Sequence, residues 1–282
     1  YFLPEWIEPT DEQVETDLCI YGGTSAGVIA AVTAKEKGLR VLLLQPGAFL
    51  GGMTTGGLGW TDFGKKHVIG GRARRFYRDV GAYYGLDEEE WQFDPRAADA
   101  VFQAYIRQKD IPVRLRQYLD AVTLGDDGRI RSIRLLGGLK VSADAFMDCT
   151  YEGDLMAKAG VRTTVGREDN RVYGETINGT QMRDKHQFTA PVDPYLEPGN
   201  PRSGPLPGVE GQALPPSGTG DHRIQAYNFR VCMTDDPDIR IPWELPGMAR
   251  ARILRFIRKT LKRYTSACLT KKGRKPRSSC RR

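Results

Sequence analysis

A chain of 282 residues is long enough for one or two domains with a full hydrophobic core. Its 40% hydrophobic and 27% charged residues are ordinary globular values and exclude a wholly disordered chain. The net charge of +7 is not spread over the chain, because residues 243–282 carry 14 Lys and Arg against one acid, a net of +13. The preceding residues, with 28 basic and 34 acidic side chains, carry a net of −6.

The sequence also disfavours a membrane-spanning protein and a protein built around a metal site or disulfide bonds. No apolar run approaches the roughly 18 residues of a membrane-spanning helix, and the first residues lack the basic-then-apolar layout of a signal peptide. The five cysteines and three histidines show no close-spaced ligand pattern, so we expect no metal site and no disulfide framework. Cys19 and Cys149 lie in apolar runs and are expected to be small buried side chains.

The first strong pattern is a strand, a glycine turn, a helix and a second strand between residues 17 and 45. Leu18–Tyr21 and Val41–Leu44 are short apolar runs typical of buried parallel strands. Between them, a glycine-rich turn at 22–27 leads into a helix predicted over 25–37, with Gly38 as its terminating residue. This order within about thirty residues is typical of a dinucleotide-binding βαβ unit.

The turn favours dinucleotide binding through its backbone. Glycines allow a tight turn and a close approach of the main chain to a pyrophosphate, whose charge is favoured by the start of a helix. Two positions depart from the usual pattern: Thr24 replaces the middle glycine, and Gln45 stands where an acid usually binds the ribose. The alternative interpretation is a structural turn in another α/β protein.

A second glycine-rich segment follows the second strand. Residues 51–59 contain five glycines in nine positions, which disfavours a stable helix or central strand. The segment is either a flexible loop or a main-chain surface lying against a flat ring or a phosphate, with Thr54 and Thr55 as hydroxyl donors. A flavin needs such a surface in addition to the pyrophosphate turn, whereas a nicotinamide dinucleotide does not obviously need it.

The remaining elements can be predicted in outline. Asp94-Pro95 is expected to begin a helix, and a β-hairpin or small meander is expected between Val113 and Leu136 around the turn at 125–128. A buried strand over 143–149 is followed by a short helix that ends at Gly160. Between residues 190 and 220, eight prolines interleave with glycines, which predicts a long irregular segment before a further strand at 224–233.

Four separated stretches resemble the bacterial FAD-dependent oxidoreductases of the glutathione-reductase-like superfamily. They are YGGTSAGVIAA at 21–31, LGGMTTGGLGWTDFG at 50–64, FMDCTYEGDLMAKAGV at 146–161 and the run that begins HQF at 186 and ends at 208. The similarity extends to Pro242. The resemblance implies an α/β fold with a Rossmann-like FAD-binding domain, a βαβ unit with a β-meander, over 1–165. Part of a mixed α/β substrate domain would follow over 166–242.

The resemblance also implies a cofactor, FAD, and the residues that hold it. The turn would line the pyrophosphate, Gln45 would approach the ribose, the second glycine segment would face the flavin, and the pair at 149–150 would match an Ala-Thr pair of the family. The implied cofactor-binding residues are Gly22, Gly23, Thr24, Ser25, Ala26, Gly27, Gln45, Gly51, Gly52, Met53, Thr54, Thr55, Gly56, Gly57, Cys149 and Thr150.

The implied activity is that of a flavoenzyme. The flavin would take a hydride or an electron pair from a small-molecule substrate and pass it to a second acceptor, neither of which the sequence identifies. No residue is identified as a catalytic base. The polar candidates in the substrate half are His186, His222, Tyr227 and Arg230.

The basic tail at 243–282 leaves three interpretations open. An apolar stripe that includes Ile253 and Ile257 among basic residues is typical of an amphipathic membrane or partner helix. The charge is also typical of a nucleic-acid tail, and with it of a non-catalytic binding protein. We favour a third interpretation, in which a frameshift or an early stop replaces the late cofactor segment of a longer enzyme. No specific nucleic-acid partner is therefore expected.

Overall fold

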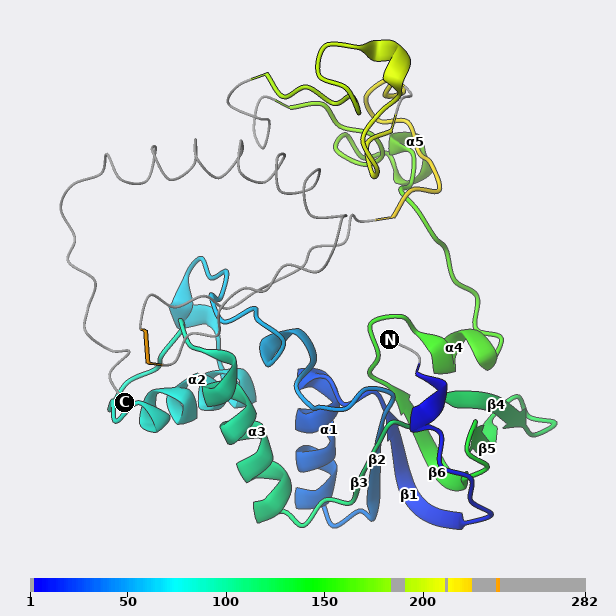
Figure 1. The fold of residues 1–282 in the computed structure, drawn as a ribbon. Helices are drawn as coiled ribbons and strands as arrows, with labels where there is room; N and C mark the ends of the chain where they lie inside the picture. Colours follow the sequence, from blue (N-terminus) through cyan, green and yellow to red (C-terminus); the bar gives the residue numbers. More distant parts are fainter. Residues whose placement is uncertain (1–2, 184–190, 211–212, 225–236, 239–282) are drawn as a thin grey trace. The chain divides into compact units, whose positions relative to one another are not determined.

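The structure is a computed structural model that describes residues 3–183, 191–210, 213–224 and 237–238 (Figure 1). The chain divides into two compact units, the first of which reaches Leu155 before the second begins at Met156. The predicted strand at 224–233, apart from its first residue, and the basic tail lie outside the described residues. In the described part of the chain, no helix is both long and apolar enough to cross a membrane.

The first unit is built on a six-stranded sheet in the order β3-β2-β1-β6-β5-β4. The strands β1, β2, β3 and β6 run parallel, whereas β4 and β5 continue the sheet from β6 as an antiparallel meander. This arrangement confirms the predicted mixed α/β fold with its meander. The strands are β1 Gln13–Tyr21, β2 Val41–Gln45, β3 Val113–Leu115, β4 Leu119–Leu124, β5 Ile130–Leu135 and β6 Lys140–Asp148.

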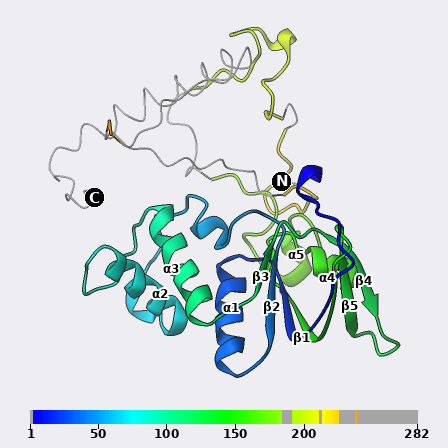
Figure 2. The same cartoon turned by 60° about the horizontal axis from the view of Figure 1, so that its bottom comes forward.

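Three long helices lie on one side of the parallel strands, as Figures 1 and 2 show: α1 Ser25–Glu36, α2 Gly71–Tyr83 and α3 Pro95–Gln108. Helix α1 packs directly on β1 and β2, α3 packs on α1, and α2 packs on α3. Ile20 and Leu43 point from the sheet into this layer and pack with Val28, Val80 and Phe102 from the helices. Asp94 caps α3 by accepting hydrogen bonds from the backbone nitrogens of residues 96 and 97, as its sequence predicts. The core on this face therefore fixes α1 against β1 and β2.

The opposite face of the same strands is covered by the meander. Since side chains alternate along a strand, Cys19, Tyr21 and Leu44 point away from the helices. They are fully or almost fully buried against residues of the meander such as Ile133 and Leu135. The Tyr21 hydroxyl also accepts a hydrogen bond from the backbone nitrogen of residue 119, at 3.0 Å. Two cores, one on each face, thus hold β1 at the centre of the sheet.

The elements differ from the sequence predictions in three places. The predicted meander does not include Val113–Leu115, because β3 pairs parallel with β2 at the other edge of the sheet. Strand β1 begins at Gln13 and not at Leu18, because its polar first half pairs with β6 along its length. Helix α2 was not predicted; its buried residues are Phe76, Val80 and Gly81, in a segment that is otherwise rich in arginine. The other short elements of the first unit are the 3₁₀ turns η1 Pro4–Trp6, η2 Gly52–Thr54 and η3 Lys66–Val68, and the first residues of α4 Asp154–Lys158.

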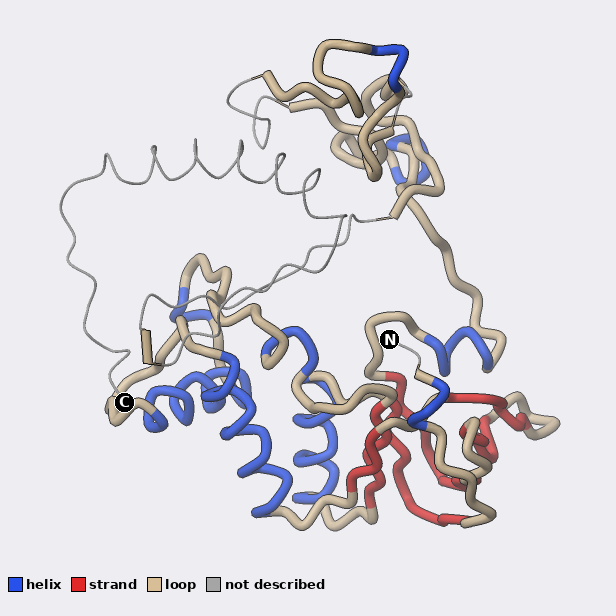
Figure 3. Tube along the Cα trace, viewed as in Figure 1, coloured by secondary structure: helices blue, strands red, loops and turns tan. Residues whose placement is uncertain are grey.

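The second unit consists almost wholly of loops, which are tan in Figure 3. Beyond the end of α4, its described residues include only the short helix α5 Asn170–Tyr173 and the 3₁₀ turn η4 Pro201–Ser203. The predicted irregular course between 190 and 220 is confirmed where the structure describes it. An isolated bridge between Arg167 and Asp221 brings the two ends of the unit's described segment together.

Candidate functional site

The glycine turn at 22–27 joins the end of β1 to the start of α1. Gly22 has a φ of +107°, and a Cβ at this position would lie 2.5 Å from the carbonyl carbon of Cys149. A Cβ on Gly27 would overlap the carbonyl oxygen of Gly22. Both glycines are therefore required by close backbone packing between β1, α1 and the end of β6.

Thr24 replaces the usual middle glycine without strain, because its φ of −68° and ψ of 176° are open to any residue. Its side chain caps α1 by accepting from the backbone nitrogen of Gly27. The same hydroxyl donates to the carbonyl oxygen of Cys149 at 2.7 Å. Thr24 therefore ties the helix start to the end of β6, a contact that glycine could not make.

The second glycine segment lies directly against this turn. The backbone nitrogen of Gly51 donates to the carbonyl oxygen of Gly23 at 2.7 Å. Ser25, the first residue of α1, donates from Oγ to the carbonyl oxygen of Gly51 at 3.1 Å, and its Oγ lies 2.7 Å from Oγ1 of Thr54. Two segments that are separated in sequence thus form one surface at the start of α1.

Gln45, at the end of β2, bonds to the turn. Its Oε1 accepts a hydrogen bond from the backbone nitrogen of Gly23 at 2.6 Å. The side-chain NH₂ takes no part in this bond and is the group that can donate to a ligand. The contact shows that Gln45 supports the turn; its predicted approach to a ribose stays a prediction.

The segment after β6 completes the site. Cys149 continues the sheet by donating from its backbone nitrogen to the carbonyl oxygen of Tyr21 at 2.7 Å. Its thiol is partly buried, which raises its pKa, with a smaller contribution from the carboxylate of Asp148. A high pKa keeps the thiol protonated and disfavours a nucleophilic role.

Tyr151 was not assigned to the site from the sequence. Its hydroxyl oxygen accepts a hydrogen bond from the backbone nitrogen of Met53 at 2.8 Å. The two residues are 98 positions apart, so no local pattern could have indicated the pairing. The only available signal was its position directly after the Cys149-Thr150 pair, at the end of a buried strand.

Three of the predicted segments therefore meet at the carboxyl ends of the parallel strands. There, they offer main-chain N–H groups at the start of a helix and the hydroxyl groups of Ser25 and Thr54. The carboxylate of Asp148 turns back to accept from the nitrogen and the hydroxyl of Thr150. A site made of N–H and hydroxyl groups fits an anionic group such as the pyrophosphate of FAD.

Some residues that the sequence assigned to the site lie away from the surface described above, and others lie outside the described residues. Thr55 turns inward and donates to the carbonyl oxygen of Leu50 at 2.5 Å, whereas the Met53 side chain is 51% exposed. His222 is exposed in the second unit, and His186, Tyr227 and Arg230 lie outside the described residues. Within the described ranges, no group of three or more His, Cys, Asp or Glu side chains is arranged to hold a metal ion.

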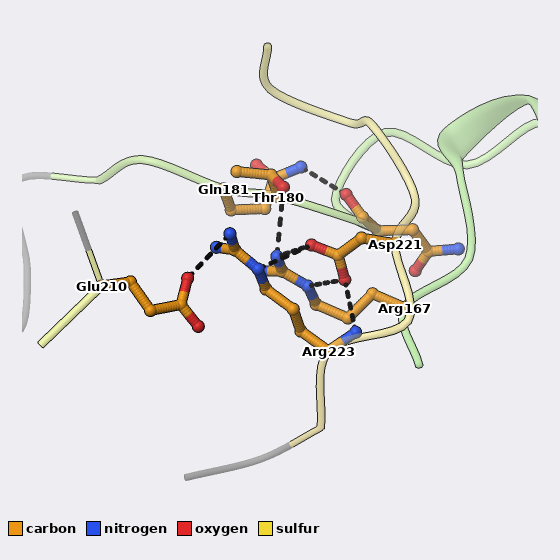
Figure 4. A network of polar contacts seen from close by, with 7 residues as sticks. Arg167, Thr180, Gln181, Glu210, Asp221 and Arg223 are labelled. Carbon is orange, nitrogen blue, oxygen red and sulfur yellow. Dashed lines mark hydrogen bonds and ion pairs between the residues drawn. The ribbon is translucent and has the colours of Figure 1, made fainter. Parts of the chain in front are cut away.

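The second unit contains a separate polar cluster, shown in Figure 4. The guanidinium of Arg167 forms two hydrogen bonds with the carboxylate of Asp221 and one, at 3.2 Å, with the hydroxyl of the buried Thr180. Arg223 pairs with Glu210 at 2.7 Å. Each of these charged side chains forms an ion pair with another side chain, which is typical of a cluster that stabilises the fold and not of a ligand site.

Comparison with solved structures gives partial matches at low sequence identity. The L-proline dehydrogenase from P. horikoshii is 12% identical, with a TM-score of 0.42 over 56% of this chain and 59% of that one. The flavin-dependent brominase Bmp2 is 16% identical, with a TM-score of 0.40 over 55% and 42%. The L-amino acid deaminase from Proteus vulgaris is 12% identical, with a TM-score of 0.42 over 57% and 54%. This chain thus spans less than two thirds of each, and a likeness at this level identifies neither a substrate nor a reaction.

Family membership is established by the sequence as a whole. No curated protein sequence matches the chain significantly. The family model described as FAD dependent oxidoreductase matches residues 17–279, which includes the turn, both later segments of the site and the second unit. The match continues beyond Pro242, where the resemblance was expected to end. The chain belongs to the FAD dependent oxidoreductase family.

Proposed function

We propose that this protein is an FAD-dependent oxidoreductase whose cofactor binds where the turn at 22–27, the segment at 51–57 and the end of β6 meet. The observation that supports the proposal most strongly is the direct bonding of the first two segments through Gly23, Ser25 and Gly51. The family match supplies the identity of the cofactor.

In this proposal, each segment holds a different part of FAD. The start of α1 holds the pyrophosphate through the N–H groups of Thr24, Ser25 and Ala26, which the helix itself does not engage. The N–H groups of Gly22, Gly23 and Gly27 bond to Leu44, Gln45 and Thr24, and these glycines shape the turn around the pyrophosphate. Gln45 donates its side-chain NH₂ toward the ribose. The segment at 51–57 presents its main chain and the hydroxyl of Thr54 to the flavin, whereas the hydroxyl of Thr55 holds the segment from within by donating to Leu50. Cys149 and Thr150 close the site from β6.

The bound flavin supplies two-electron chemistry by accepting a hydride or an electron pair. The substrate is a small organic molecule, and we assign residues 166–242 to the part of the protein that binds it. The chain's own contribution at the cofactor site is to orient FAD and neutralise its charge with N–H groups. The thiol of Cys149 stays protonated there, because burial raises its pKa.

The proposal predicts the effect of a charge at the start of α1. Ala26 is exposed in the first turn of the helix, so Ala26→Asp places a carboxylate there. A carboxylate at a helix start stabilises the helix by about 0.3–1 kcal/mol, whereas it repels a pyrophosphate bound to the same N–H groups. We expect the Kd for FAD to rise about tenfold or more, with no loss of thermal stability.

The measurement is a titration of FAD fluorescence with wild-type protein, Ala26→Asp and the nearly isosteric, neutral Ala26→Asn. Ala26→Asn is expected to bind much more tightly than Ala26→Asp, and the difference is expected to shrink at high salt. Equal affinities for the two variants would show that no pyrophosphate binds at α1. Competition by NAD⁺ or NADP⁺ at concentrations similar to that of FAD would favour a nicotinamide-dependent dehydrogenase instead.

A further inference from the structure

The turn at 51–54 has a second attachment, to the segment that follows β6. Tyr151 projects from the segment after β6 and accepts a hydrogen bond from the backbone nitrogen of Met53 at 2.8 Å. This bond joins the middle of η2 to β6, whereas Ser25 and Gly23 join Gly51 to α1. The proposed flavin-facing turn is thus held from both of the elements that flank it.

The turn is shaped to receive this tyrosine. Gly52 has a φ of +55°, and a Cβ at this position would overlap the hydroxyl oxygen of Tyr151 and lie 2.9 Å from its Cζ. The space that a side chain would occupy at position 52 is therefore taken by the end of the tyrosine ring. The glycine and the tyrosine are complementary parts of one contact.

The backbone on both sides of Tyr151 is held by hydrogen bonds. The carboxylate of Asp148 accepts from the nitrogen of Thr150 at 2.9 Å and from its hydroxyl at 2.7 Å. The oxygen of that hydroxyl accepts from the nitrogen of Gly153 at 2.8 Å. These bonds form a compact backbone turn that includes Tyr151.

We infer that Tyr151 is a positioning residue for the flavin: it sets the main-chain course of residues 51–54 against which the ring lies. This inference rests on the proposed function, since it concerns the same cofactor site. Tyr151 acts through the backbone of Met53 and Gly52. Tyr151 is not proposed to take part in the redox reaction itself.

The test replaces the hydroxyl and keeps the ring. In Tyr151→Phe, the backbone nitrogen of Met53 loses its partner, and we expect the Kd for FAD to rise about three- to tenfold. The visible spectrum of bound FAD is also expected to shift, because the groups next to the ring move. Tyr83→Phe on α2 is the control, since Tyr83 is 51% exposed and Tyr151 is 54% exposed.

A double-mutant cycle separates this contact from a general loss of stability. Gly52→Ala introduces backbone strain in any background and still approaches the ring carbon Cζ in Tyr151→Phe, but the closest overlap, with the hydroxyl oxygen, exists only when Tyr151 is present. We therefore expect Gly52→Ala to weaken FAD binding less in the Tyr151→Phe background than in the wild type. Hydrogen exchange at the Met53 amide of the FAD-free protein is expected to be faster in Tyr151→Phe.

The outcomes distinguish the two proposals. If wild-type protein binds FAD while Tyr151→Phe leaves the Kd, the spectrum and the Met53 exchange unchanged, the positioning role is wrong and the proposed function stands. Additive effects of Gly52→Ala and Tyr151→Phe on the Kd for FAD would also contradict the positioning role. If wild-type protein does not bind FAD at all, the proposed function fails, and the role of Tyr151 toward a flavin fails with it.

Discussion

At the scale of single residues, the glycines of the first turn serve packing as much as cofactor approach. Gly27 lies within α1, where alanine would ordinarily be the better helix former by up to about 1 kcal/mol. The structure predicts the opposite effect here, because a Cβ on Gly27 would overlap the carbonyl oxygen of Gly22. A backbone atom in the sheet-to-helix turn cannot move aside as a flexible side chain can.

We expect Gly27→Ala to lower the free energy of unfolding by about 1–3 kcal/mol, the usual cost of overpacking. Urea unfolding followed by circular dichroism measures the effect. The matched control is Gly64→Ala, where a Cβ would have no atom within 4 Å, and a change within about 0.5 kcal/mol is expected. A Gly27→Ala variant as stable as the wild type would contradict the packing described for the turn.

At the scale of elements, the sequence predicts what depends on local pattern. The strands β1 and β2, helix α1, the cap of α3 at Asp94 and the meander follow from apolar runs and turn residues, and the structure confirms them. Helix α2 was missed because only Phe76 and Val80 mark its buried face among many arginines. Contacts between distant segments, such as Tyr151 with Met53 and Gln45 with Gly23, leave no periodic signal and require the fold.

The second unit is also held together by a contact between residues far apart in sequence, Arg167 and Asp221. Arg167 and Asp221 exchange two backbone hydrogen bonds, and the Arg167 guanidinium binds the Asp221 carboxylate. Hydrogen bonding to Arg167 lowers the pKa of Asp221 to about 2. Since the unfolded value is near 3.9, the stabilisation is complete above about pH 4 and is lost as the pH falls toward 2.

We therefore expect hydrogen-exchange protection of the Arg167 and Asp221 amides to decrease between about pH 4 and pH 2, after correction for intrinsic rates. Asp221→Asn removes the charge at every pH, so its protection is expected to be lower at neutral pH and to change less on acidification. Asp126→Asn, in the turn between β4 and β5, is the control. Equal protection of these amides from exchange in wild type and Asp221→Asn at pH 7 would show that the ion pair does not stabilise the second unit.

At the scale of the whole molecule, the net charge of +7 conceals two different parts. The body, with a net charge of −6, contains the sheet, both cores and every residue of the candidate cofactor site. The family match includes this body from residue 17 onward and most of the basic segment that follows. The central claim concerns the body alone: the surface formed at the carboxyl ends of β1, β2 and β6 holds FAD.

The visible absorption spectrum of purified protein, incubated with FAD and then freed of unbound cofactor, tests that claim most directly. We predict flavin bands in proportion to protein, which bleach on anaerobic reduction and return when an electron acceptor is added. A colourless protein after the same treatment, with its folded state confirmed by circular dichroism, would contradict the account.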